Sequence, residues 1–146
     1  MNEKCVRGAP LAALLGLWLV GGVAAAAEPS SPPALVKQLI DKELQGVPGK
    51  ELLTLTVEYP PGGASPPHRH NAQVFVYVLD GELTMQVAGS PALTLRRGQT
   101  FYESPADVHV VSANASKTAP ATILVFMIKD KNAPGSRAVR QGERRE

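Results

Sequence analysis

Between residues 50 and 130 the chain consists of short runs of β-forming residues, separated by turn-forming residues such as Asp80-Gly81 and Arg97-Gly98, and in the run 53–59 apolar and polar residues alternate. Period-two alternation places every second side chain on the same face and is typical of β-strands. No helical periodicity interrupts the runs, which argues against a βαβ arrangement and indicates an antiparallel sandwich or barrel. The seven predicted strands are 53–59, 74–79, 83–87, 92–95, 100–103, 108–112 and 122–128.

The composition fits one ordinary globular domain. Of the 146 residues, 44% are hydrophobic and 19% are charged, and this apolar fraction is too high for a wholly disordered chain. The 15 basic and 13 acidic residues are spread along the sequence and give a net charge of +2. Nucleic acid binding requires a concentrated basic face, so we predict no nucleic acid partner.

Residues 1–27 have the three parts of a secretory signal peptide: a basic start, a short apolar run over 9–23, and small residues ending at Ala27. We predict cleavage after Ala27 and a periplasmic or secreted protein that has no membrane contact after cleavage. Cys5 is the only cysteine and would leave with the signal peptide. Because no thiolate would remain, a metal ion would have to be held by histidine, carboxylate or amide side chains.

Residues 28–49 are expected to form a linker and one amphipathic helix. Three prolines within 28–33 indicate an extended linker. Apolar residues within 34–45 recur every three to four positions, which predicts a helix, and the turn-forming residues 46–49 would end it. A helix with an apolar stripe needs a partner surface, and together with open sheet edges it predicts a homodimer. The stripe consists of Leu35, Val36, Leu39 and Ile40.

The β domain is predicted over residues 50–130, and a polar, basic tail follows over 131–146. We expect most of that tail to be disordered or loosely docked. Within the domain, the runs 74–79 and 122–128 are apolar at both odd and even positions. Such runs are typical of strands that are buried on both faces.

The three histidines, His68, His70 and His109, all lie in the predicted β domain. Side chains at positions i and i+2 of a strand project to the same face, roughly 6–7 Å apart, so the first two can share a metal ion. Histidines in strands are more often surface or core groups than ligands. The spacing from glycines is more specific, because His68 follows Gly62 by six residues and His109 follows Gly98 by eleven.

These spacings resemble the two motifs of the cupin superfamily, over about residues 53–128. The first motif corresponds to Gly62, His68, His70 and Gly81. The position of its usual glutamate holds Val74 instead. The second motif corresponds to Gly98 and His109, although Ser104 and Ala106 replace its usual proline and glycine.

The resemblance implies an all-β fold, a double-stranded β-helix of jelly-roll type, whose cavity usually holds one divalent metal ion. It implies as ligands His68, His70 and His109. Val74 cannot bind a metal ion, so the fourth ligand is left open between Glu103, Gln73 and water. Glu103 lies six residues before His109, and this even number can place both on one face. Gln73 would reach the site only if a bulge shifted the strand register.

Imidazole ligands favour a divalent transition metal (Mn, Fe, Ni, Cu or Zn) over Mg or Ca. The cavity is expected to admit a small, partly apolar molecule. Two functions stay open: a metalloenzyme of oxygenase, lyase or isomerase type, and a non-catalytic ligand-binding or sensing protein with or without metal. The predicted cavity lining is Tyr59, Val76, Met85, Phe101, Tyr102 and Phe126.

Overall fold

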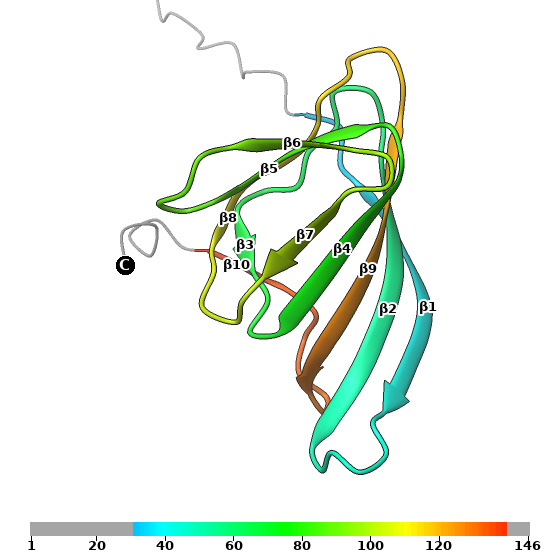
Figure 1. Cartoon of the computed structure of the whole chain (residues 1–146), viewed down its shortest axis with the longest axis vertical. Helices are drawn as coiled ribbons and strands as arrows, with labels where there is room; N and C mark the ends of the chain where they lie inside the picture. The colour runs from blue at the N-terminus through cyan, green and yellow to red at the C-terminus, as the bar shows by residue number, and fades with distance from the viewer. Residues whose placement is uncertain (1–30, 140–146) are drawn as a thin grey trace, which may run out of the picture.

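The computed structural model describes residues 31–139, which form two antiparallel β-sheets packed face to face (Figure 1). The first sheet has the strand order β1-β2-β9-β4-β7 and the second β10-β3-β8-β5-β6. The strands are β1 (Leu35–Glu43), β2 (Lys50–Tyr59), β3 (His68–Arg69), β4 (Gln73–Asp80), β5 (Glu82–Val87), β6 (Leu93–Arg96), β7 (Thr100–Glu103), β8 (His109–Asn114), β9 (Ala121–Asp130) and β10 (Arg137–Ala138). The predicted all-β jelly-roll class is confirmed.

Each of the seven predicted strands is present. They correspond to β2 and to β4 through β9, and their ends differ from the predicted ends by at most three residues. Alternation along the strands fixes their orientation, since every second side chain of β2, β4 and β9 points between the two sheets. These inward side chains form the core, which includes Leu53, Leu55, Val57, Val74, Val76, Val78, Leu83, Met85, Ile123, Val125 and Met127.

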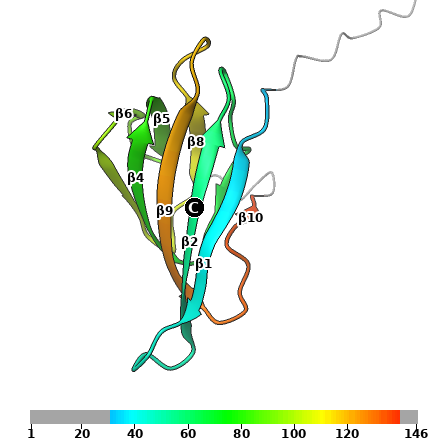
Figure 2. The ribbon, with the colours of Figure 1, turned by 90° about the vertical axis from the view of Figure 1, so that its right-hand side faces the viewer.

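The helix predicted over 34–45 is wrong, because this segment is the edge strand β1, paired antiparallel with β2 (Figure 2). A bulge explains the misleading spacing. Gln38 lies opposite Leu55, and two residues later Ile40 lies opposite the adjacent Thr54, so β1 carries one extra residue. The extra residue shifts which face the later side chains occupy, and apolar residues three to four apart then fit a strand. Pairing with β2 overrides the helix propensity of the segment, which is rich in leucine, lysine and glutamine.

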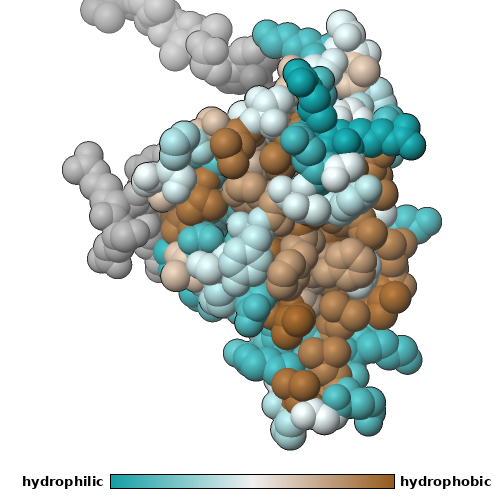
Figure 3. All heavy atoms as spheres, viewed as in Figure 1, coloured by the Kyte–Doolittle hydropathy of each residue, from teal (hydrophilic) through white to brown (hydrophobic). Residues whose placement is uncertain are grey.

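The outward face of the β1-β2-β9-β4-β7 sheet is apolar and exposed (Figure 3). Phe75 and Tyr77 of β4 are 44% and 43% exposed, and Tyr102 and Phe126 on the neighbouring strands are 50% and 38% exposed. The runs 74–79 and 122–128 are therefore buried on their inner side only, contrary to the expectation of burial on both faces. We call these four aromatic residues and the strands around them the outer apolar face.

Residues 1–30 and 140–146 lie outside the described part of the chain. The predicted signal peptide, 1–27, therefore lies outside it as well. Over 31–139, no helix has the length and the apolar character that a membrane span would need.

We expect Gly81→Ala to destabilise the fold strongly. Gly81 has a φ of +74°, and a Cβ there would lie 2.7 Å from Cα and Cβ of Ala121. Left-handed strain and a clash with backbone together predict a loss of about 3 kcal/mol in the free energy of unfolding, measured by urea denaturation. Gly89→Ala is the matched control, because Gly89 also has a positive φ but faces open space. It should cost only about 1 kcal/mol, and equal losses in both variants would contradict the clash.

Candidate functional site

The structure brings the three histidines together between the two sheets. His68 lies on β3 directly opposite His109 on β8, and His70 follows two residues after His68. The ring centroid of His68 lies 4.8 Å from that of His70 and 5.4 Å from that of His109. The remaining pair, His70 and His109, is separated by 6.1 Å. Three imidazoles from two separate parts of the chain thus form one cluster.

Glu103 on β7 completes the cluster with a carboxylate. Its Oε2 lies 2.9 Å from Nε2 of His109 and 3.2 Å from Nε2 of His70. In the register of the first sheet, Glu103 stands directly opposite Val74 of β4. Val74 occupies the position where the cupin motif usually has its glutamate, so the carboxylate comes from the neighbouring strand instead. This cross-strand placement explains how the cluster contains a carboxylate although the motif position does not.

Several atoms of this cluster are buried without a hydrogen-bond partner. They are Oε2 of Glu103 and both ring nitrogens of His109, and these side chains are 4% and 1% exposed. Oε2 and Nε2 lie 2.9 Å apart, but their contact does not have the geometry of a hydrogen bond. A buried polar atom without a partner costs about 1–3 kcal/mol, and native structures contain few of them. Buried oxygen and nitrogen atoms that lie close together without hydrogen bonds are the arrangement expected where a cation binds.

The distances in the cluster agree with that interpretation. Two ligand atoms that each lie about 2.1 Å from one ion are separated by about 3.0–3.4 Å. The separations of 2.9 and 3.2 Å between Glu103 Oε2 and the imidazole nitrogens are close to this range. Among the residues that the structure describes, no group of three or more histidine, cysteine, aspartate or glutamate side chains has a geometry that could hold a metal ion. The side chains of the cluster would therefore have to shift to surround one.

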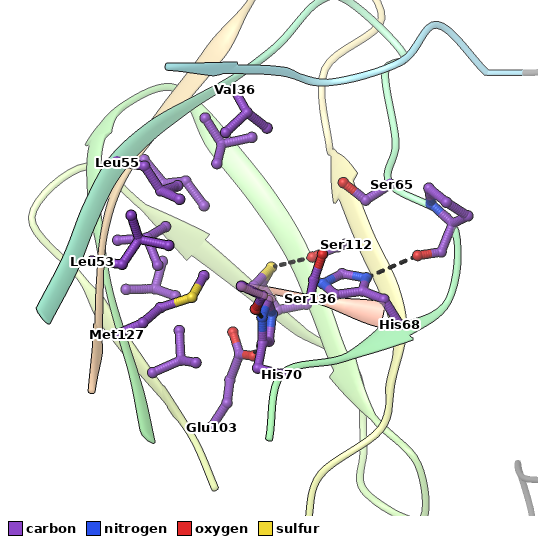
Figure 4. Close-up of a pocket in the computed structure, with 18 of the residues that line it drawn as sticks. Val36, Leu53, Leu55, Ser65, His68, His70, Glu103, Ser112, Met127 and Ser136 are labelled. Carbon is purple, nitrogen blue, oxygen red and sulfur yellow. Dashed lines mark hydrogen bonds and ion pairs between the residues drawn. The ribbon is translucent and has the colours of Figure 1, made fainter. Parts of the chain in front are cut away.

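Two backbone carbonyls fix the orientation of two of the rings. Nδ1 of His68 donates to the carbonyl of Pro66 at 2.8 Å, and Nδ1 of His70 donates to the carbonyl of Gly135 at 2.6 Å. With the proton on Nδ1, Nε2 of each ring is free to bind a metal ion, and for His68 that nitrogen lies on the cavity side (Figure 4). Burial lowers the pKa of His68, which keeps this ring neutral at pH 7, as a ligand must be.

Gln73 is not brought to the cluster. It is exposed, at the start of β4, and pairs with Ile128 on the outward side of the sheet. The register of β4 has no shift between Gln73 and Val78, so the bulge that would turn its side chain inward is absent from this stretch.

A cavity of about 530 Å³ adjoins the cluster. The predicted lining residues that do line it are Tyr59, Val76 and Met85. Phe101 packs its ring edge-on against His109, with centroids 5.8 Å apart. Tyr102 and Phe126, also predicted to line the cavity, lie on the outer apolar face instead. Parity along a single strand could not distinguish the two faces, because both are apolar.

Residues 131–139, which we call the C-terminal strap, close one side of the site. Within the strap, β10 pairs with β3, and the carbonyl of Gly135 holds His70. A buried ion pair anchors the strap, because Lys129 donates both to Glu51 and to the carbonyl of Ala133. Sequence reasoning missed this arrangement. One signal was available in the sequence. Glu51 lies two residues before the inward-facing Leu53, so alternation along β2 places the Glu51 carboxylate on the inward face, where it needs a partner.

The comparisons with known proteins agree with this architecture. The family described as the cupin domain matches residues 55–127, half of the chain, so the chain belongs to the cupin family. A germin-like protein of Arabidopsis thaliana, subfamily 2 member 2, is 29% identical over 122 residues, which cover 75% of this chain and 54% of that protein.

Two solved structures are similar to the chain over most of its length. An oxalate oxidase in complex with the substrate analogue glycolate has a TM-score of 0.56 and 27% identity, covering 73% of this chain and 55% of that one. A cupin domain from Bordetella pertussis has a TM-score of 0.56 and 25% identity, covering 70% and 99%. The chain thus spans about half the length of the germin-like protein and the oxidase, and nearly all of the bacterial domain.

We expect the ion pair that anchors the strap to make stability sensitive to acid. The hydrogen bond from Lys129 holds the pKa of Glu51 below its ordinary value. A carboxyl group with a lowered pKa stabilises the folded chain above its unfolded pKa, about 4.3, and this contribution is lost as pH falls through the folded pKa. The free energy of unfolding of the wild type should therefore exceed that of Glu51→Gln at pH 7, and this difference should shrink below about pH 4.

Urea denaturation of both proteins at pH 7, 5, 4 and 3 measures this difference. Glu43→Gln is the control, because its ion pair with Lys131 is exposed and exposed pairs contribute little. A difference between wild type and Glu51→Gln that does not change with pH would contradict the prediction.

Proposed function

We propose that this chain binds one divalent transition metal ion (Mn, Fe, Ni, Cu or Zn) and acts on a small molecule held in the adjoining cavity. The proposed ligands are His68, His70, His109 and Glu103. The observation that carries the proposal is the group of buried, unpartnered atoms on Glu103 and His109. Nitrogen and carboxylate donors in this combination suit a transition metal rather than Mg or Ca.

Each residue has a separate part in the proposal. Glu103 offsets one of the two positive charges that the ion brings into a buried site. The carbonyls of Pro66 and Gly135 keep His68 and His70 in the tautomer that a ligand requires. When bound, the ion would supply Lewis acidity or, if it is redox-active, oxidative chemistry.

The class of reaction is proposed as oxygenase, lyase or isomerase. The similarity to an oxalate oxidase at 27% identity supports an enzyme. A specific observation supports the alternative, a non-catalytic ligand-binding or sensing protein. Among the described residues that line the cavity, Glu103 is the only carboxylate. If Glu103 binds the metal ion, no second carboxylate is left to act there as a general acid or base.

A periplasmic or secreted location is part of the proposal. It depends on residues 1–27, whose basic start, apolar run and small residues are those of a signal peptide.

We expect tag-free protein to contain close to one transition metal ion per chain, measured by mass spectrometry of the elements. His109→Ala should lose the ion, because it removes a buried imidazole at the centre of the cluster. Glu103→Gln should weaken metal affinity at least tenfold, because the ion's charge is no longer offset. Gln73→Ala is the control and should bind metal like the wild type, since its side chain lies outside the cavity.

Wild-type protein without metal, whose melting temperature does not change on adding Mn, Fe, Ni or Zn, would overturn the metal proposal. If Gln73→Ala weakened metal affinity and Glu103→Gln did not, the choice of Glu103 as the fourth ligand would be wrong.

The homodimer also belongs to the proposal, with the outer apolar face as the contact. The composition of 74–79 and 122–128 is that of strands buried on both sides, and a second copy would bury the exposed side. In the middle of the central strand β9 the outward residues Leu124, Phe126 and Ile128 are apolar, and the charged outward residue of this strand, Asp130, lies at its end. A two-fold axis places one such face against itself.

We expect sedimentation equilibrium to show a dimer, and Tyr102→Glu with Phe126→Glu to shift it to monomer. Two buried, unpaired carboxylates on each copy would oppose the contact. Thr94→Glu on the opposite sheet, at an exposed position of β6, is the control and should leave the dimer intact. A wild-type monomer at 1 mM protein would refute the dimer.

A further inference from the structure

The cavity has an apolar end and a polar end (Figure 4). Leu53, Leu55 and Met127 form the wall away from the imidazoles, and Val36 of the edge strand lies above them. The other end contains the cluster and hydroxyl groups, including that of Ser112. A ligand that fills the cavity therefore contacts hydrocarbon over most of its surface and polar atoms at one end only.

No lysine or arginine is among the described residues that line the cavity. Lys129 is held by Glu51 and by the carbonyl of Ala133. Arg69, between the two histidines, is not a lining residue, although its Nε is buried without a hydrogen-bond partner. Removing a carboxylate from water into apolar surroundings without a cationic partner is strongly unfavourable. In the absence of a bound metal ion, the lining therefore disfavours organic anions, and a dianion most of all.

The polar end provides hydroxyl groups for one neutral oxygen atom. Ser112 is 4% exposed, and its hydroxyl donates only to the thioether sulfur of Met85, at 3.3 Å. Sulfur is a weak acceptor, so a carbonyl or hydroxyl oxygen of a ligand would accept this hydrogen bond more favourably. Two further hydroxyl groups, those of Ser65 and Tyr59, also line the cavity, and their oxygens lie 3.2 Å apart.

The geometry points to a neutral, mostly hydrocarbon ligand that carries one carbonyl or hydroxyl group, with that oxygen at the end of the cavity near Ser112 and the imidazoles. A volume of about 530 Å³ exceeds what a two-carbon acid needs and lies in the ordinary range for small organic ligands. The ligand class inferred for this chain is thus unlike oxalate or glycolate. The inference rests on the proposed function for the role of the ligand, but binding of the hydrocarbon part needs no metal ion.

Titrations of metal-free protein followed by methyl NMR test this inference with matched probes. 2-Octanone and octanoate have the same number of carbon atoms and differ in charge, and oxalate is the dianion. We expect 2-octanone to shift the methyl signals of Leu55 and Val125 and to bind at least tenfold more tightly than octanoate. Oxalate should not shift these signals. Octanoate or oxalate binding as tightly as 2-octanone, or no shift with 2-octanone, would overturn the inference.

Two variants locate the binding. Val125→Phe adds volume inside the cavity and should weaken 2-octanone at least tenfold, whereas Leu124→Phe on the outward side of the same strand should not. Ser112→Ala should weaken 2-octanone several-fold and leave toluene, which has no oxygen, unchanged. Equal effects of both phenylalanine variants would mean that the probe binds outside the cavity, and the inference would fail.

Titrating metal-free and metal-loaded protein separates this inference from the proposed function. If 2-octanone binds but no preparation of the protein takes up a metal ion, the ligand class stands and the proposed metal function fails. If the protein binds metal but only oxalate then binds, the proposed function stands and the neutral ligand class is refuted.

Discussion

The register between β4 and β7 is the constraint on which the site depends. It places Glu103 opposite Val74, and because side chains of directly opposed residues share a face, the carboxylate enters the space where the motif position supplies none. A slip of one residue would turn Glu103 outward and bring Tyr102 in. The pairing of β3 with β8 does the same for His68 and His109. Two local registers thus assemble a cluster from three separate segments of the chain.

The sequence contained most of the fold and part of the site. Short β-forming runs between turn residues predicted the seven main strands, by alternation in β2 and by continuous apolar runs in β4 and β9, and the histidine spacing predicted which rings would meet. The edge strand β1 was misread as a helix because a bulge produced a helical spacing, and bulges depend on a partner strand that periodicity does not show. The strap was missed because it acts through the backbone carbonyl of Gly135, and a backbone contact has no residue signature.

The apolar character of both sheet faces had opposite consequences for prediction. It made β4 and β9 easy to find, and it made their inner and outer side chains hard to tell apart, which is why Tyr102 and Phe126 were assigned to the cavity. The same composition makes the outward face as apolar as a buried core, although this face is exposed. On the inward face it produces a cavity in which Glu103, the only carboxylate among the described lining residues, lies at one end. This asymmetry supports both the proposed metal centre and the inferred ligand class.

The orientation of His70 depends on a carbonyl that lies 65 residues further along the chain. Before the residues after Asp130 have been synthesised, β2, β4 and β9 can already pair. The ring of His70 is then free to rotate, because the carbonyl that fixes it has not yet been made. Because synthesis starts at the amino terminus, the strands that enclose the cavity are made before the last group that orients the histidine cluster. β10 is the last of the described strands in the sequence, and the carbonyl of Gly135 just before it must be in place before His70 is held.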